Sequence, residues 1–392
     1  MAVELTLPTI SPQAMTLESV GPITLVLGSV ISIAPTITTN PTISGTAKVG
    51  ETLTATAGDT TGTPPPTSTL QWQRSDNGTS GWSDISGATG TTYVLVSADE
   101  SKYLRVEQTA TNIEGSATAT SASTSQVQPA FTGLLDTYSG AAAAYSLRLL
   151  RGDYEGNCIR VRRLDDNAEQ NIGFRNNELD TSALTTFCGS SDGFVVTWFD
   201  QSDNETPNNL TQSTASSQPK IVSEGSVILE EEKPTLEFDG INDFMLSDSI
   251  SSNQPISFFH LRRYRTTDQV KNALTLSNDT GFAWGDYFDG GKLRAYFGST
   301  GSTSAGYNTN RNLWSVIANG SNSTISLNGS STEESLGNSN IDQISLGRRG
   351  APIQGVNAAI NCQELVLYLS DVGTTNFEGI ETNINDHYSI YE

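Results

Sequence analysis

Apolar and polar residues alternate with a period of two between Gly193 and Gly240. Two alternating stretches are joined there by the polar turn Asp200-Gln-Ser-Asp-Asn204, and the region closes on Leu236-Glu-Phe-Asp-Gly240. A period of two sends successive side chains to opposite faces of a strand, and turn residues between such strands are typical of packed β-sheets. The sequence therefore predicts an all-β fold built from sandwiches.

The length of 392 residues predicts two domains, because a single hydrophobic core stops growing at roughly 250 to 300 residues. Short alternating strands separated by Gly, Pro and Asn fill residues 38–128, a polar linker follows at 129–133, and the second domain covers 134–392. Residues 1–37 are apolar and proline-rich. They predict a docking segment that adds to a neighbouring subunit or, alternatively, a first strand of the next domain.

Helices are expected only in the second domain. The predicted helices are an alanine-rich stretch at 134–150, the segment 181–188 with Asp180 as its N-cap, and the C-terminal segment 376–388. The three cysteines show no C-x-x-C spacing, which argues against a zinc site. We expect buried thiols, or else a Cys158–Cys188 pair, with Cys362 unpaired.

Two features of residues 38–128 carry a family resemblance. Trp72 stands where an immunoglobulin-like domain has its central buried tryptophan, and Asp99-Glu-Ser-Lys-Tyr103 is similar to its tyrosine corner. The region therefore resembles the immunoglobulin-like modules of bacteria and bacteriophages, many of which lack paired cysteines. This resemblance implies a spacer or a weakly adhesive unit.

The second domain carries another set of motifs. Ala144-Tyr-Ser-Leu-Arg148, Ile159-Arg-Val-Arg-Arg163 and Trp198-Phe-Asp-Gln-Ser202 precede the Leu236–Gly240 segment. Together they resemble the catalytic domain of the α-L-arabinofuranosidase B family, a concanavalin A-like jelly roll that also occurs in bacteriophage virion proteins. The resemblance implies an immunoglobulin-like sandwich followed by a jelly roll at 134–392.

The catalytic carboxyl groups that this resemblance implies are not both found in the sequence. A retaining glycosidase needs two carboxyl groups about 5 to 5.5 Å apart, and the resemblance implies a glutamate nucleophile on a middle strand. No glutamate occurs between Phe238 and Thr332, and the expected segment offers only Asp286 and Asp289. The shorter arm of aspartate would misplace the carboxylate. We therefore predict that the chain is not an enzyme, with Asp286 and Asp289 as the pair to test.

A glycan-binding loop is the alternative use of the same segment. Sugar sites combine an aromatic ring with carboxylate and amide groups, and one glycine-bounded stretch holds Phe282, Trp284, Asp286, Tyr287 and Asp289. The competing interpretation is that Phe282 and Trp284 alternate into the core. The sequence predicts no cofactor, although calcium is a further possibility. Two sets of oxygen ligands have suitable spacing, and both are also typical of ordinary turns. They are Asp200, Asp203 and Asn204, or Asp239, Asn242 and Asp243.

The net charge and the hydropathy of the chain limit the kinds of partner that it can bind. The net charge of −22 and the pI near 4.3 disfavour nucleic acid, and no apolar stretch reaches the ~20 residues of a membrane span. The basic cluster Arg262-Arg-Tyr-Arg265 could pair with acidic residues of a neighbouring subunit, bind acidic polysaccharide groups, or guard an edge strand.

The two resemblances together imply a structural protein on the surface of a bacteriophage virion, either a head decoration or fibre or a tail-associated fibre. The segment 1–37 would bind other virion proteins, and a homo-oligomer would present the jelly roll to host-surface glycans with avidity. Two alternatives stay open: an arabinofuranosidase-like glycan hydrolase carried on the virion, and a secreted bacterial adhesin.

Overall fold

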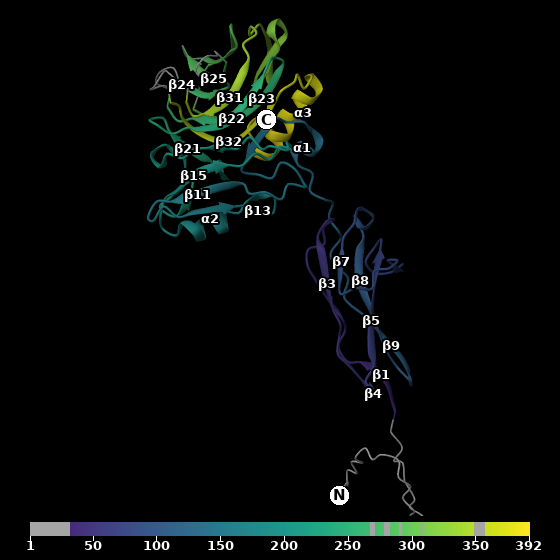
Figure 1. Cartoon of the computed structure of the whole chain (residues 1–392). Coiled ribbons are helices and arrows are strands. Elements are labelled where there is room, and N and C mark those ends of the chain that lie inside the picture. Colours follow the sequence, from purple (N-terminus) through teal and green to yellow (C-terminus); the bar gives the residue numbers. More distant parts are fainter. Residues whose placement is uncertain (1–31, 267–270, 278–282, 290–291, 307–308, 349–356) are drawn as a thin grey trace, which may run out of the picture. The chain divides into compact units, whose positions relative to one another are not determined.

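The computed structural model describes residues 32–266, 271–277, 283–289, 292–306, 309–348 and 357–392 (Figure 1). The chain divides into two compact units between Ala130 and Phe131. Strands dominate both units, so the prediction of an all-β fold is confirmed. Residues 1–31 of the docking segment predicted at 1–37 lie outside the described residues.

The smaller unit consists of strands that pack around a tryptophan. Trp72 is fully buried, and its indole Nε1 donates a hydrogen bond to the Gly90 carbonyl oxygen over 2.9 Å. Asp99, also buried, accepts from the Tyr93 hydroxyl at 2.9 Å. The sheets have the orders β2-β3-β7, β6-β5-β8-β9 and β1-β4. The strands are β1 (Ile33–Ile37), β2 (Thr42–Ser44), β3 (Thr52–Thr56), β4 (Thr60–Thr63), β5 (Thr67–Ser75), β6 (Ser83–Asp84), β7 (Thr92–Val94), β8 (Tyr103–Asn112) and β9 (Gly115–Thr120).

The larger unit is a jelly-roll-like sandwich of antiparallel strands. One run of strands joins β10, β21 and β23 to β32, and it continues from β23 through β28 and β29 to β30. A second run has the order β16-β22-β31-β24-β25-β26-β27. Strands β15 and β17 connect the two runs, because β15 pairs with β16 and with β17, and β17 pairs with β21; β11 and β12 extend the sheet beyond β15.

The strands of this unit have the following bounds. They are β10 (Ala143–Ser146), β11 (Ile159–Arg163), β12 (Glu169–Ile172), β13 (Phe174–Arg175), β14 (Glu178–Leu179), β15 (Gly193–Trp198), β16 (Leu210–Thr211), β17 (Lys220–Ser223), β18 (Ser226–Val227), β19 (Leu229–Glu230), β20 (Lys233–Pro234), β21 (Leu236–Asp239), β22 (Met245–Ser252), β23 (Ile256–Tyr264), β24 (Lys271–Thr275), β25 (Trp284–Asp289), β26 (Lys292–Tyr296), β27 (Thr300–Gly306), β28 (Arg311–Ala318), β29 (Ser323–Leu327), β30 (Ser330–Glu334), β31 (Ile341–Leu346) and β32 (Ala359–Tyr368).

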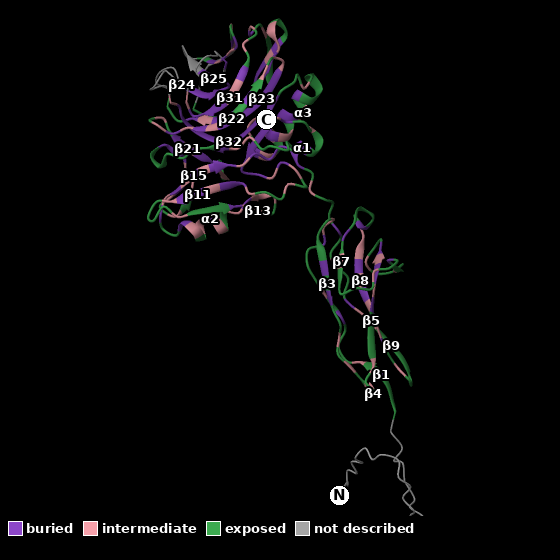
Figure 2. Cartoon of the chain, viewed as in Figure 1, coloured by how far each residue is buried: buried purple, intermediate pink, exposed green. Residues whose placement is uncertain are grey.

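Strand β23 shows how the period of two builds the core. Phe258 and Tyr264 point into the main core of the sandwich, whereas Phe259 and Leu261 point to the opposite face. That second face packs against apolar residues of helices α1 (Leu134–Thr137) and α3 (Thr374–Tyr388). Both faces of β23 are therefore covered, and Figure 2 shows the buried residues concentrated in the central strands of this unit.

The helix predictions had mixed outcomes. Helix α2 spans Thr181–Cys188 with Asp180 as its N-cap, as predicted. The helix predicted at 134–150 is wrong, because α1 ends at Thr137 and Ala143–Ser146 form strand β10 against β32. Burial of all four residues of β10 outweighs the helical propensity of alanine.

None of the described helices combines the length and apolarity that a bilayer span requires. All three cysteines are free and buried.

Replacing the N-cap of α2 should have a small, measurable cost. The Asp180 carboxylate accepts a hydrogen bond from the Ala183 backbone N–H at 2.9 Å. We expect Asp180→Ala to lower the free energy of unfolding of the larger unit by about 1 kcal/mol. Chemical denaturation measures this change, and Asp180→Asn, which keeps a capping oxygen, should recover most of it. Equal losses in the two variants would contradict the capping role.

Candidate functional site

Four side chains form a row across four neighbouring strands of the larger unit. The register places Arg162 of β11 opposite Phe194 of β15, Phe194 opposite Lys220 of β17, and Lys220 opposite Glu237 of β21. Residues directly opposite each other on paired strands share a face of the sheet. The row lies on the face turned away from the main core, because the residues that alternate with it belong to that core: Val161, Val195, Ile221, Leu236 and Phe238.

The row lines a pocket of about 530 Å³. The Arg162 guanidinium carbon lies 5.0 Å from the centre of the Phe194 ring, and the Lys220 ammonium nitrogen lies 5.4 Å from the same centre. Both distances fall within the range of cation–π attraction. Leu164, which is 49% exposed, adds an aliphatic surface to the same pocket. The pocket thus offers an aromatic ring with two cations close to it.

Both cations are fixed by neighbouring side chains. Arg162 Nε donates to the Gln218 side-chain oxygen at 2.7 Å, and Lys220 Nζ forms an ion pair of 2.7 Å with Asp192. At the other end of the row, Glu237 pairs with Arg265 over 3.3 Å. These contacts hold the row in one geometry, which is what a binding site requires before its ligand arrives.

A tight turn brings two more carboxyl groups to the pocket. Asp239 Oδ1 accepts hydrogen bonds from the backbone N–H groups of Ile241, Asn242 and Asp243 at 2.7, 3.1 and 3.2 Å. The Asp239 backbone N–H donates in return to Asp243 Oδ2 at 2.9 Å. Asp239 therefore holds the turn, and Asp243 lines the pocket with only 7% of its surface exposed.

The turn gives Asp243 an unusual acidity. Burial raises the pKa of Asp243 to about 7, and the negative charges of Asp239 and Glu237 add to that increase. The hydrogen bond from the Asp239 backbone acts in the opposite direction and is outweighed. A carboxyl group that keeps its proton near neutral pH, beside carboxylates in the same pocket, has the properties of a general acid.

The segment predicted as a glycan-binding loop forms strand β25 instead. Asp286 and Tyr287 lie on this strand with 0% and 5% exposure. Trp284 and Asp289 belong to the same strand, but their side chains lie outside the described residues, as does all of Phe282. The assignment of these five residues to a glycan site stays a prediction.

Asp286 belongs to a buried charge cluster between β23 and β25. Its two carboxylate oxygens accept from Arg262 Nε at 2.8 Å and Arg262 Nη2 at 3.1 Å. The Tyr264 hydroxyl donates at 3.2 Å, and His260 Nδ1 lies 3.0 Å away. Burial alone would raise the pKa of Asp286, but the charge of Arg262 and the contacts with His260 lower it to about 2. Arg262 is fully buried, so it does not guard an exposed edge.

Two of the carboxylates considered as calcium ligands, Asp200 and Asp239, accept hydrogen bonds from backbone N–H groups. Asp200 Oδ1 accepts from the Ala144 and Ser202 backbone N–H groups, and Asp200 Oδ2 accepts from Asn208 N–H. Asp239 is used in the same way. Within the described ranges, no group of three or more His, Cys, Asp or Glu is arranged to hold a metal ion.

Comparisons with known proteins identify similar folds among solved structures but no family at the level of sequence. No family model and no curated protein sequence matches the chain. A mutant GH54 α-L-arabinofuranosidase soaked with 4-nitrophenyl α-L-arabinofuranoside matches with a TM-score of 0.50 and 15% identity, over 64% of this chain and 63% of that chain. An arabinofuranosidase complexed with arabinofuranosyl-α-1,2-xylobiose matches with a TM-score of 0.47 and 15% identity over 62% of each chain. A Trypanosoma rangeli sialidase in complex with sialic acid matches with a TM-score of 0.36 and 8% identity, over 86% and 68%.

The chain spans less than two thirds of the length of these arabinofuranosidases. The GH54 likeness shows a shared jelly-roll-like fold. A fold shared with a glycoside hydrolase contradicts two linked predictions, the virion structural role and the absence of enzyme activity. Nothing in the comparisons indicates a phage structural role, and the alternative of an arabinofuranosidase-like hydrolase fits the GH54 likeness better.

The sequence interpretation missed the pocket for a physical reason. It looked for catalytic carboxyl groups only around Asp286, and it used Leu236–Gly240 as a mark of the fold. The alternation of β21 already places Glu237 and Asp239 on the polar face. The rest of the row, however, comes from β17, β15 and β11, which lie up to three strands away and extend back to Arg162, and one sequence does not reveal that pairing.

Proposed function

We propose that the larger unit is a glycoside hydrolase that acts on arabinose-containing glycans at the pocket of Arg162, Phe194, Lys220, Glu237 and Asp243. The observation that carries this proposal is the pocket itself, where a buried carboxyl group with a raised pKa, further carboxylates and an aromatic ring line one cavity. The GH54-like fold supports the substrate class.

The roles follow from the chemistry of glycosidic bonds. Hydrolysis needs one carboxylic acid to protonate the leaving oxygen and one carboxylate to act as nucleophile or base. Asp243 is the proposed acid, because its pKa of about 7 leaves it protonated in mildly acidic solution and about half protonated near pH 7. Glu237, the remaining pocket carboxylate outside the turn, is the proposed partner. Asp239 positions Asp243 through the turn.

Release of nitrophenol tests the function of the whole chain. We expect the wild-type protein to hydrolyse 4-nitrophenyl α-L-arabinofuranoside, and Asp203→Asn, a change at an exposed aspartate outside the pocket, to leave the rate unchanged. Absence of release by pure folded protein, on this substrate and on arabinan, would contradict the proposal.

The aromatic ring should contribute to substrate binding. We expect Phe194→Ala to raise KM about three- to tenfold with a smaller effect on kcat, because the ring would cover the C–H face of the sugar and each buried CH₂-sized contact is worth roughly 0.8 kcal/mol. Steady-state kinetics measure this split. Phe187→Ala is the matched control, since Arg163 lies 5.0 Å over that ring outside the pocket. An equal effect of the two variants on KM would count against a substrate contact at Phe194.

For the smaller unit we propose an immunoglobulin-like module that acts as a spacer. The buried Trp72 and the buried Asp99, which binds Tyr93, support this assignment. The limits 38–128 and 134–392 stay predictions for the two domains. Expression of residues 134–392 alone, with full hydrolytic activity, is the expected result if the spacer takes no part in the chemistry.

A further inference from the structure

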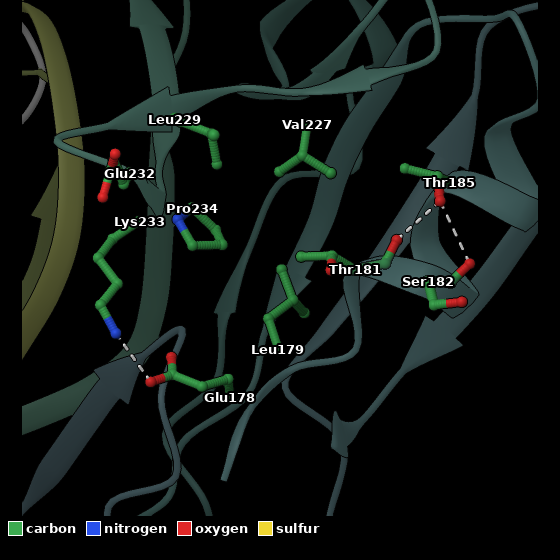
Figure 3. A pocket seen from close by; sticks show the side chains of 10 residues that line it. All are labelled: Glu178, Leu179, Thr181, Ser182, Thr185, Val227, Leu229, Glu232, Lys233 and Pro234. Atoms are coloured by element: carbon green, nitrogen blue, oxygen red, sulfur yellow. Dashed lines mark hydrogen bonds and ion pairs between the residues drawn. The ribbon is translucent and has the colours of Figure 1, made fainter. Parts of the chain in front are cut away.

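A second pocket, of about 560 Å³, lies on the larger unit and shares no lining residue with the first (Figure 3). Its walls come from β14, from the first two turns of α2 and from the strands β18, β19 and β20. None of its residues takes part in the proposed hydrolysis. The pocket therefore needs an explanation of its own.

The lining of this pocket is sorted into three zones. Figure 3 shows Glu178, Glu232 and Lys233 on one side and the hydroxyl groups of α2 on the other. Between them lies an aliphatic strip formed by Leu179, Val227, Leu229 and Pro234. A sugar ring has the matching pattern, because its face presents C–H groups and its rim presents hydroxyls that both donate and accept.

The charges of the pocket favour a neutral ligand. Lys233 Nζ pairs with Glu178 Oε1 at 3.0 Å, which balances one carboxylate. His387 Nε2 lies 3.4 Å from the same oxygen, but burial lowers the pKa of His387 to about 4, so this ring is neutral at pH 7. The carboxylate of Glu232 is left as a net negative charge, in a chain whose total is −22. An anionic sugar would be repelled.

The backbone holds Glu232 in an uncommon conformation. Glu231 and Glu232 form the two-residue turn between β19 and β20 with φ of 49° and 66°. Such turns favour Gly, Asn or Asp, because a left-handed backbone conformation costs other residues conformational free energy. The turn nevertheless carries a glutamate whose side chain lines the pocket.

We propose that this pocket is a second, non-hydrolytic binding site for a neutral sugar unit of the glycan. The inference rests on the proposed function for the chemistry of the ligand, while the site itself does not involve Asp243. Two sites on one unit raise the effective concentration of a polymeric substrate at the first pocket.

Native gel electrophoresis in the presence of soluble arabinan tests this site in the full chain. The starting variant is Phe194→Ala in an Asp243→Asn background, which is expected to weaken the first pocket and to slow cleavage of arabinan during the run; it is called the Phe194→Ala protein below. Glu232→Gln and Leu229→Glu are then added separately; Leu229 is 53% exposed, so the fold should tolerate the change. The matched controls are Glu224→Gln, another hairpin glutamate with φ of 50°, and Ile113→Glu, at a 77% exposed position of the smaller unit.

We expect the Phe194→Ala protein to be retarded by arabinan, the Glu232 and Leu229 changes to weaken that binding at least threefold, and both controls to leave it unchanged. Binding that is insensitive to both pocket changes, or no retardation of the Phe194→Ala protein, would overturn the proposal. Neither result affects release of nitrophenol by the wild-type protein, so failure of the second site is distinguishable from failure of the hydrolase.

Discussion

Asp243→Asn should reduce hydrolysis of arabinan, whose leaving group is a sugar hydroxyl that needs a proton, by about 10²- to 10⁴-fold, the usual contribution of a general acid. Asparagine has nearly the same shape, and its oxygen can still accept the hydrogen bond that Asp243 accepts from the Asp239 backbone. It cannot donate a proton to a leaving group. We therefore expect the melting temperature to change little while kcat falls.

The pH dependence gives the same prediction a second readout. Asp243 is protonated below its pKa of about 7 and loses its proton as the pH rises through that value. The activity of the wild-type protein should thus be highest in mildly acidic solution and decline above about pH 7. A basic limb in the same position for Asp243→Asn, or a loss of activity matched by a loss of folded protein, would contradict the role of Asp243 as the acid.

Asp286→Ala should instead destabilise the larger unit by about 3–5 kcal/mol, because removal of one partner from a buried ion pair leaves the other charge unpaired. Both Asp286 and Arg262 are fully buried, and two hydrogen bonds join them. The cluster connects β23 to β25, so its loss should loosen the contact between these strands. Chemical denaturation measures the change in the free energy of unfolding.

The matched control is the surface pair of Asp166, which is exposed, and Arg163, which is partly exposed; their charged atoms lie 2.7 Å apart. Asp166→Ala should leave the denaturation midpoint nearly unchanged, because solvent screens this pair. The pKa of Asp286 is lowered to about 2, so its stabilisation is present above about pH 4 and is lost as the pH falls towards 2. A normal midpoint for Asp286→Ala together with loss of activity would make Asp286 a functional group rather than a structural one.

The all-β fold was predictable because it follows from local alternation. Gly193–Trp198 and Leu236–Asp239 show the period of two in sequence and form strands in the structure. Ala143–Ser146 was not predictable in this way. Its local propensity favours a helix, but the segment forms a strand because it pairs with β32 and is buried.

The candidate site was less predictable because it depends on register. Arg162, Phe194, Lys220 and Glu237 become neighbours only through the pairing of four strands. The raised pKa of Asp243 likewise arises from burial in a folded turn. By contrast, Asp286 is conspicuous in sequence, yet its partners His260 and Arg262 bind it inside the core.

A crystal structure of the Asp243→Asn protein soaked with 4-nitrophenyl α-L-arabinofuranoside tests most directly where the sugar binds. We predict density for the sugar against the Phe194 ring, with the glycosidic oxygen near residue 243 and Glu237 beside the sugar. Density for the sugar beside Asp286 on β25, or an empty pocket at saturating substrate, would contradict the proposed active site.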